Sequence, residues 1–215
     1  MNLLRLALFT ISLFSAPIEV FAQSNSVLRP EEAVKFASEA NIPARYWQWV
    51  MNLPPPLDDE DQIIDTDCSV NQPRDVWFLA GHVRVGPKQR FCRIPKGRIV
   101  IVPVYANADY PRRDSPLPCE NIRARVLDTS TSTPVKLHAE VDGKDVRDVA
   151  KYRVQATSCF DMFPDGTTYK GAPAFASGYW LVLKNLTPGS HKIKFSNLGI
   201  VYGPKETTYD VVVDL

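Results

Sequence analysis

The chain has 215 residues, with 25 basic and 24 acidic side chains and a formal net charge of +1. This near balance argues against a general polyanion binder, so we do not expect nucleic acid as a partner. The sequence has three histidines and lacks the G-x-S-x-G, H-E-x-x-H, phosphate-loop and dinucleotide-binding motifs. The composition therefore favours a globular protein without the common catalytic signatures.

Residues 1–22 are typical of a secretory signal peptide. Arg5 provides a short basic start, residues 6–18 form an apolar stretch, and residues 20–22 form a cleavage signal. The apolar stretch is short and interrupted, so a retained membrane anchor is the less favoured alternative. We therefore expect a secreted or periplasmic protein with no stable membrane insertion after signal cleavage.

The predicted mature part holds an even number of cysteines: Cys68, Cys92, Cys119 and Cys159. None of them forms a C-x-x-C pair, and an oxidising compartment favours structural disulfides. Among the three connectivities that four cysteines allow, we expect the sequential one, Cys68 with Cys92 and Cys119 with Cys159. The first bond would close a loop in the unfolded chain, which stabilises the folded state by roughly 3 kcal/mol in the chain-entropy model.

Residues 23–75 are expected to form an N-terminal helical segment followed by an acidic linker. A proline at an early helical position and two acids in the first turn predict a helix that begins near Pro30. A second helix is predicted over residues 43–52, because the prolines at 54–56 cannot continue it.

The second predicted helix carries Tyr46, Trp47 and Trp49, which allow two interpretations. Exposed aromatic rings this close together could form a platform that stacks on sugars or peptides. Positions 46 and 49 share a helical face, however, and such a face also suits docking onto the apolar side of a sheet. We favour docking and keep the ligand platform as the alternative.

The acidic linker contains five candidate calcium ligands: Asp58, Asp59, Asp61, Asp65 and Asp67. Crowded carboxylate oxygens on a loop are what calcium prefers. The run lacks the EF-hand pattern and its central glycine, so an exposed acidic loop is the plainer interpretation. Calcium is the only cofactor that the sequence suggests.

From residue 76 onward the hydrophobic period changes to two, which predicts strands. The expected strands are 76–80, 90–94, 98–105, 122–127, 135–141, 152–156, 179–183, 191–196 and 207–213. Short strands separated by turns predict a mainly β domain over residues 76–215, an antiparallel β-sandwich of jelly-roll or immunoglobulin-like type. The runs at 99–104 and 179–183 are apolar on both faces, and the Trp-bearing helix is their natural cover.

Several stretches carry a family resemblance: Tyr46-Trp47-Gln48-Trp49, Asp65-Thr66-Asp67-Cys68, residues 76–81, residues 90–97 and Gly178-Tyr179-Trp180. Together they resemble a family of secreted bacterial proteins with no assigned activity. Residues 186–191 also look like the turn-and-strand pairs of bacterial immunoglobulin-like domains. The resemblance implies an exported, disulfide-linked, β-rich protein and assigns no activity to any residue.

Two classes of function remain open. The first is a binding or interaction module of the cell envelope or extracellular space, with a protein or glycan partner. The alternative is a secreted hydrolase of envelope or extracellular polymers that combines an acid of residues 58–67 with a histidine. A cleft holding His82 or His191 next to a carboxylate would favour the enzyme, whereas isolated histidines would favour the module. We assign no catalytic residue.

Overall fold

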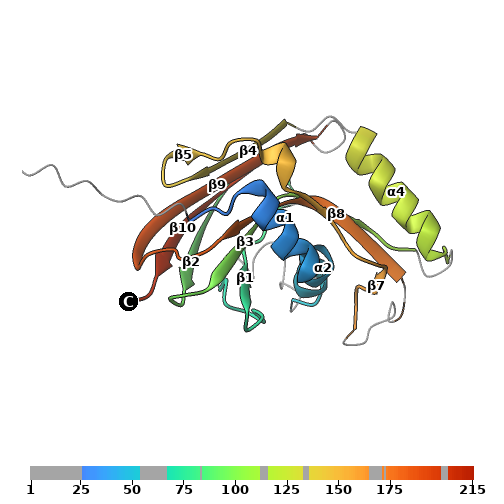
Figure 1. Cartoon of the computed structure of the whole chain (residues 1–215), viewed down its shortest axis with the longest axis horizontal. Coiled ribbons are helices and arrows are strands. Elements are labelled where there is room, and N and C mark those ends of the chain that lie inside the picture. The colour runs from blue at the N-terminus through green and yellow to red at the C-terminus, as the bar shows by residue number, and fades with distance from the viewer. Residues whose placement is uncertain are drawn as a thin grey trace, which may run out of the picture.

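Strands predominate among the described residues from 76 onward, as the sequence predicts. The computed structural model describes residues 26–53, 67–82, 84–111, 116–132, 136–164, 171, 173–199 and 203–215. Its elements are α1 (Pro30–Glu39), α2 (Ile42–Met51), β1 (Val76–Phe78), β2 (Gly86–Ile94), β3 (Ile99–Asp109), α4 (Cys119–Ser132), β4 (Lys136–Val141), β5 (Lys144–Asp145), the 3-10 turn η1 (Val149–Tyr152), β6 (Arg153–Gln155), β7 (Phe160–Asp161), β8 (Pro173–Leu183), β9 (Gly189–Gly199) and β10 (Gly203–Val213) (Figure 1).

The strands form two mixed sheets. Sheet A has the order β1-β3-β8-β6, with β7 also paired to β8, and sheet B has the order β2-β10-β9-β4-β5. Most pairs are antiparallel, but β1 runs parallel to β3, and β2 runs parallel to β10. The mainly β prediction is therefore confirmed, but the structure does not support a purely antiparallel, jelly-roll or immunoglobulin-like sandwich. A hairpin signal such as Asp142-Gly143 reveals a local pair, here β4 with β5, but it cannot reveal parallel partners.

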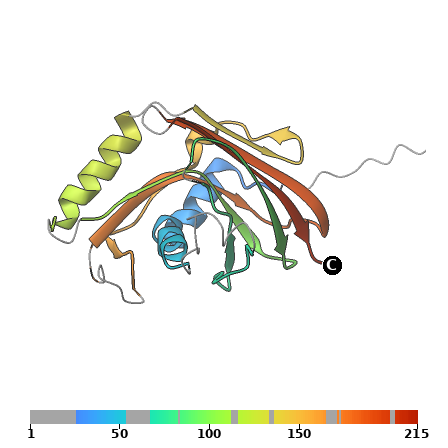
Figure 2. The same cartoon turned by 180° about the vertical axis from the view of Figure 1, so that it is seen from behind.

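Sheet A is the middle layer of the molecule. Sheet B lies on one of its faces, and α1 and α2 lie on the other (Figure 1 and Figure 2). Nearly every residue of β8 is buried, which requires cover on both faces. The Tyr46 ring of α2 lies 4.8 Å from the Trp180 ring of β8, centroid to centroid. The expectation that the Trp-bearing helix covers the apolar strands is confirmed.

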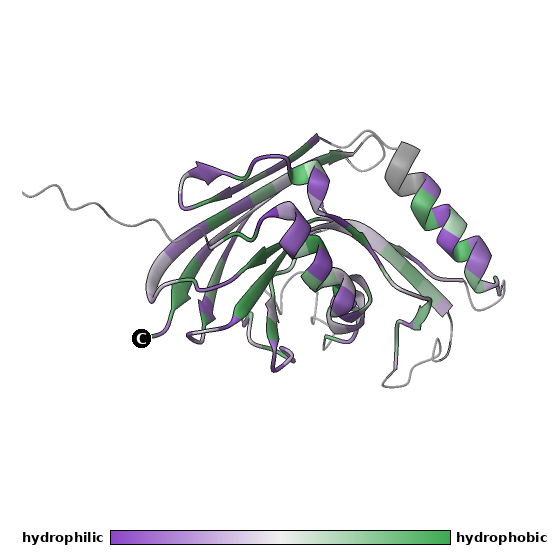
Figure 3. Ribbon diagram, viewed as in Figure 1, coloured by the Kyte–Doolittle hydropathy of each residue, from purple (hydrophilic) through white to green (hydrophobic). Residues whose placement is uncertain are grey.

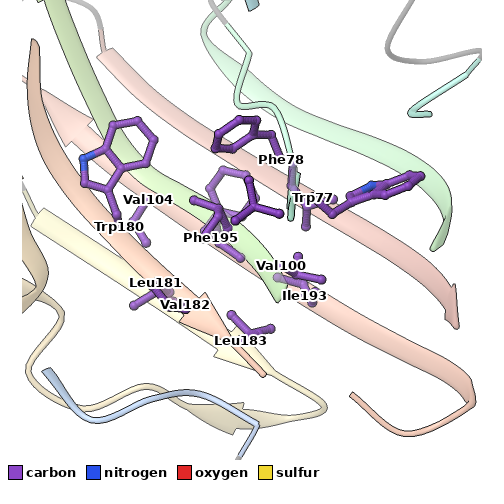
Figure 4. Close-up of a cluster of buried hydrophobic side chains, with 14 of the residues drawn as sticks. Trp77, Phe78, Val100, Val104, Trp180, Leu181, Val182, Leu183, Ile193 and Phe195 are labelled. Carbon is purple, nitrogen blue, oxygen red and sulfur yellow. The ribbon is translucent and has the colours of Figure 1, made fainter. Parts of the chain in front are cut away.

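The core between the two sheets consists of interleaved apolar side chains. Val100 and Leu181 of sheet A belong to one buried cluster with Ile193 and Phe195 of sheet B (Figure 4). Trp180 belongs to the same cluster and is fully buried. One continuous core therefore holds the helices and both sheets together.

Residues 122–127, which we predicted to be a strand, lie in helix α4. Ile122 and Val126 are four residues apart and fully buried, which is helical spacing. Both pack with Phe175 of β8, and α4 lies on the side of β8 away from α2 (Figure 1). A short apolar run fits the period of a strand or of a helix. Here the packing of Ile122 and Val126 against Phe175 favours the helix.

Both predicted disulfides are confirmed. Cys68 is bonded to Cys92, and Cys119 is bonded to Cys159. The first ties the turn before β1 to strand β2, and the second ties the start of α4 to the segment between β6 and β7. The first bond therefore ties a peripheral turn to sheet B, whereas the second joins two segments that lie outside the strands.

Replacing Trp49 with alanine tests the role of α2 as part of the core. We expect a loss of about 3 to 5 kcal/mol in the free energy of unfolding, because a buried tryptophan leaves a cavity. Met51→Ala, at the exposed end of the same helix, should change it by less than about 0.5 kcal/mol. Urea denaturation followed by fluorescence measures both, and equal small effects would show that α2 is not needed to cover sheet A.

Candidate functional site

The aromatic rings of α2 lie inside the protein. Tyr46 is only 5% and Trp49 only 7% exposed, and the Tyr46 ring contacts those of Phe78 and Trp180 edge-on. Trp47 is half-buried and packs against the same core. The ligand platform of Tyr46, Trp47 and Trp49 is therefore not what the structure shows, and docking onto the sheet is confirmed.

Four of the five aspartates proposed to bind calcium lie outside the described residues: Asp58, Asp59, Asp61 and Asp65. Asp67 is described and belongs to a local turn. The hydroxyl of Ser69, at 2.6 Å, and its backbone N–H, at 2.8 Å, both donate to the Asp67 carboxylate. These bonds lower the pKa of Asp67. The carboxylate thus has a structural partner, and calcium binding by the acidic run stays a prediction.

His82 and His191 use both ring nitrogens in structural contacts. The nitrogens of His82 lie 2.9 Å from the Thr207 hydroxyl and 3.0 Å from the Gly86 carbonyl. The nitrogens of His191 lie 2.8 Å from the Asp142 carboxylate and 2.7 Å from the Thr187 carbonyl. Neither ring leaves a nitrogen free to take a proton from a substrate, so the His191–Asp142 contact does not create a catalytic base.

No described helix or strand covers the outer face of sheet B. Along β2 and β10 the residues alternate between buried and more exposed positions, as expected for a sheet with one solvated face. In Figure 3, β5 and much of β9 are hydrophilic, whereas β3 is mainly hydrophobic. This face is the part of sheet B that a ligand can reach.

Two neighbouring cross-strand rows on this face line a groove of about 460 Å³. The first row crosses β2, β10, β9 and β4 through Pro87, Glu206, Ser196 and His138. The second row crosses β10, β9 and β4 through Pro204, Leu198 and Lys136. Two prolines and a leucine thus provide apolar surface, flanked by a cation, an acid and an imidazole.

Apolar and charged side chains are mixed over the whole outer face of sheet B. Two ion pairs join β9 to β10: Lys194 with Glu206 at 3.1 Å and Lys192 with Asp210 at 3.5 Å. Phe91 is 57% exposed and Leu198 is 40% exposed. The two exposed ion pairs add little to the stability of the fold. A mixture of apolar side chains with polar neighbours is common in protein contact surfaces.

His138 lies at the edge of the groove and contacts a carboxylate. Its Nε2 atom is 3.0 Å from the Asp145 carboxylate, and Ser196 is its cross-strand neighbour. No hydrogen bond joins Ser196 to His138 in the described structure. The hairpin thus places serine, histidine and aspartate in one region without the contact that would activate the serine.

A second hollow of about 400 Å³ lies beside α2. The polar side chains that line it from α2 and the residue after it already have partners within the protein. Arg45 forms an ion pair with Asp75 at 2.6 Å. Gln48 and Asn52 donate to the carbonyls of Asp161 and Met162, at 2.8 and 2.9 Å respectively. These bonds join α2 to the neighbouring loops, which explains the polar lining without a ligand.

The groove has no signature in the sequence, because its rows depend on the pairing of strands that are distant along the chain. The alternating residues of 135–141 and 207–213 predicted that one face of each strand is solvated. The partners of these strands come from β2 and β9, and β2 joins β10 in parallel. No local pattern specifies this parallel contact.

No family model and no curated protein matches this chain. Among solved structures, PbICP-C in complex with falcipain-2 is similar over 65% of this chain and 99% of that chain, with 9% identity and a TM-score of 0.29. Amebosin, determined in solution, is similar over 60% of this chain and 96% of its own, with 12% identity and a TM-score of 0.21. Likeness at this level carries no argument about function.

Two further observations bear on the location of the protein. All four cysteines are paired in disulfides, which is typical of proteins that fold in an oxidising compartment. None of the described helices combines the length and the hydropathy that a bilayer-spanning helix requires.

The contacts of His191 predict a pH dependence of stability. Burial lowers the pKa of His191, but the hydrogen bond to Asp142, the Thr187 carbonyl and the Asp142 charge outweigh it, so the pKa is raised. A raised folded-state pKa adds stability that is fully present below the unfolded value, about 6.5, and is lost as pH rises through the folded value. We therefore expect the free energy of unfolding to decrease over this interval.

Asp142→Asn should flatten this decrease, because it removes the negative charge and leaves an amide that still accepts a hydrogen bond. Asn also tolerates the positive φ of 52° at this position. Asp145→Asn, beside the exposed His138, is the matched control and should keep the wild-type slope. Urea unfolding at several pH values and NMR titration of the His191 ring measure the effect, and equal slopes in both variants would contradict it.

Proposed function

We propose that this protein is an exported binding module of the cell envelope or extracellular space that contacts a protein partner through the outer face of sheet B. One observation carries the proposal. Sheet A has cover on both faces, whereas the outer face of sheet B has no described cover and combines a groove with exposed apolar side chains. Exposed apolar groups rimmed by polar residues are typical of interaction sites.

Three features support export. The two disulfides suit an oxidising compartment, residues 1–22 have the pattern of a signal peptide, and the family resemblance points to secreted bacterial proteins. The periplasm and the extracellular medium satisfy all three features equally well. The proposal therefore covers both locations.

A protein partner fits the face better than a glycan. Sugar rings bind well to exposed aromatic rings, and the aromatic cluster of α2 is used inside the core. Phe91 is the one aromatic among the large apolar side chains that are exposed in the described chain. The groove instead offers aliphatic and proline surface between charged groups, which suits the mixed side chains of a protein.

A hydrolase is the second candidate, because Ser196 lies opposite His138, which contacts Asp145. These are the residue types of a serine, histidine and aspartate triad. Acyl transfer also needs N–H donors aimed at the developing oxyanion. Strands β9 and β10 are hydrogen-bonded on both sides, so their backbone N–H groups are used in the sheet. The binding module is therefore the better-supported function.

Site-specific photo-crosslinking tests the proposal in the cells that make the protein. A photoreactive residue replaces Leu198 in the groove or, as the matched control, Lys35 on the exposed side of α1. We expect one defined protein adduct from position 198 and none from position 35. Adducts from position 35 alone would place the contact surface elsewhere.

Variants of the captured complex test the same surface quantitatively. Leu198→Asp should weaken binding of the identified partner by about tenfold or more, because it places a charge in the apolar part of the contact. Lys35→Ala should leave the affinity unchanged. Circular dichroism verifies that both variants are folded, and an unchanged affinity of folded Leu198→Asp would contradict the proposal.

A further inference from the structure

Three metal-ligating side chains converge at the β4–β5 edge of sheet B: His138, Glu140 and Asp145. His138 and Glu140 are two residues apart on one face of β4, and Asp145 is the direct partner of Glu140 on β5. One ligand atom of each lies within 4.8 Å of the other two. We propose that this trio binds a transition-metal dication, with Zn²⁺ as the best fit.

The charges of the trio favour a dication. Carboxylates directly opposite each other in an antiparallel pair repel, as in the Glu140 and Asp145 pair. His138 contacts Asp145, but no hydrogen bond or ion pair joins Glu140 to any residue in the described chain. Lys194 is opposite Glu140 on β9, and its ammonium contacts Glu206 instead, at 3.1 Å. A bridging cation would turn this repulsion into attraction.

The ligand types favour zinc over calcium or magnesium. Calcium and magnesium take oxygen ligands, whereas imidazole nitrogen together with carboxylates suits zinc and its neighbours in the first transition row. Zinc bonds of about 2.0 to 2.2 Å place tetrahedral ligand atoms about 3.4 Å apart. The His138 and Asp145 atoms, which lie 3.0 Å apart, need only a small shift, and a separation near the limit of 4.8 Å must shorten. The His138 and Asp145 side chains are 46% and 75% exposed, so rotation about their side-chain bonds can provide this movement.

The backbone around the trio is held in place. Asp142 and Gly143 form a tight turn with positive φ angles of 52° and 75°, which fixes the register of β4 against β5. The Asp142 carboxylate also accepts the backbone N–H of Lys192 at 2.8 Å, which ties the turn to β9. Three protein ligands leave a coordination position open, and the trio adjoins the groove, because His138 belongs to both.

Metal titration of the isolated, tag-free protein with both disulfides formed tests this inference without any partner. Calorimetry with Zn²⁺ and visible absorption of Co²⁺ should show one saturable site. His138→Ala, Glu140→Gln and Asp145→Asn should each weaken Zn²⁺ binding by at least about tenfold. Asp148→Asn is the matched control, because it removes an exposed carboxylate outside the trio at a positive φ of 55° that Asn tolerates, and it should bind as the wild type does.

NMR of the imidazole rings identifies the ligand directly. Added Zn²⁺ should shift the His138 resonances and leave those of His82 and His191 in place. Absence of saturable binding up to about 1 mM Zn²⁺, or equal affinity in the wild type and the three trio variants, would overturn the inference. Because no partner is present, this result is independent of the crosslinking experiment on the proposed function.

Discussion

The burial of sheet A on both faces is the constraint on which the rest of the structure depends. Strands β3 and β8 are apolar on both sides. Leaving either face in water would reduce the free energy of unfolding by about 25 cal/mol for every Å² of exposed apolar surface. A second sheet can cover only one face. Helix α2 covers the other with its aromatic side chains, which places Phe78 and Trp180 under cover. The helices therefore belong to the same core as the strands.

Buried polar contacts then fix how the layers are aligned. The β-bulge between Pro103 and Tyr105 interrupts the pairing of β3 with β8, and the Asn197 amide of sheet B donates to the Val104 carbonyl at 2.9 Å. Arg90 of β2, only 3% exposed, donates to two carbonyls of the loop after β1. Because buried polar groups must be paired, these bonds fix how sheet B is positioned on sheet A.

The local features of the fold could be predicted from sequence, and the distant pairings could not. Alternation and composition predicted most strands, the role of the Trp-bearing helix and both disulfides. Residues 122–127 were assigned the wrong period, since a short apolar run fits a strand or a helix until its packing partners are known. The groove depends on the parallel pairing of β2 with β10, for which the sequence has no local signal. The trio of His138, Glu140 and Asp145 could have been predicted from the sequence, because a two-residue Asp-Gly turn places position 140 opposite position 145.

The edge of sheet B also decides how a partner can contact its outer face. Strand β2 ends the sheet order and pairs with β10 on one side only, and such an edge can recruit a strand from another chain. Pro87 has no N–H to donate, and Lys88 and Arg93 place charges along the same strand. These residues oppose the addition of a further strand. The partner that we propose would therefore contact the side chains of the face, where Leu198 and the prolines provide apolar area, rather than extend the sheet through its backbone.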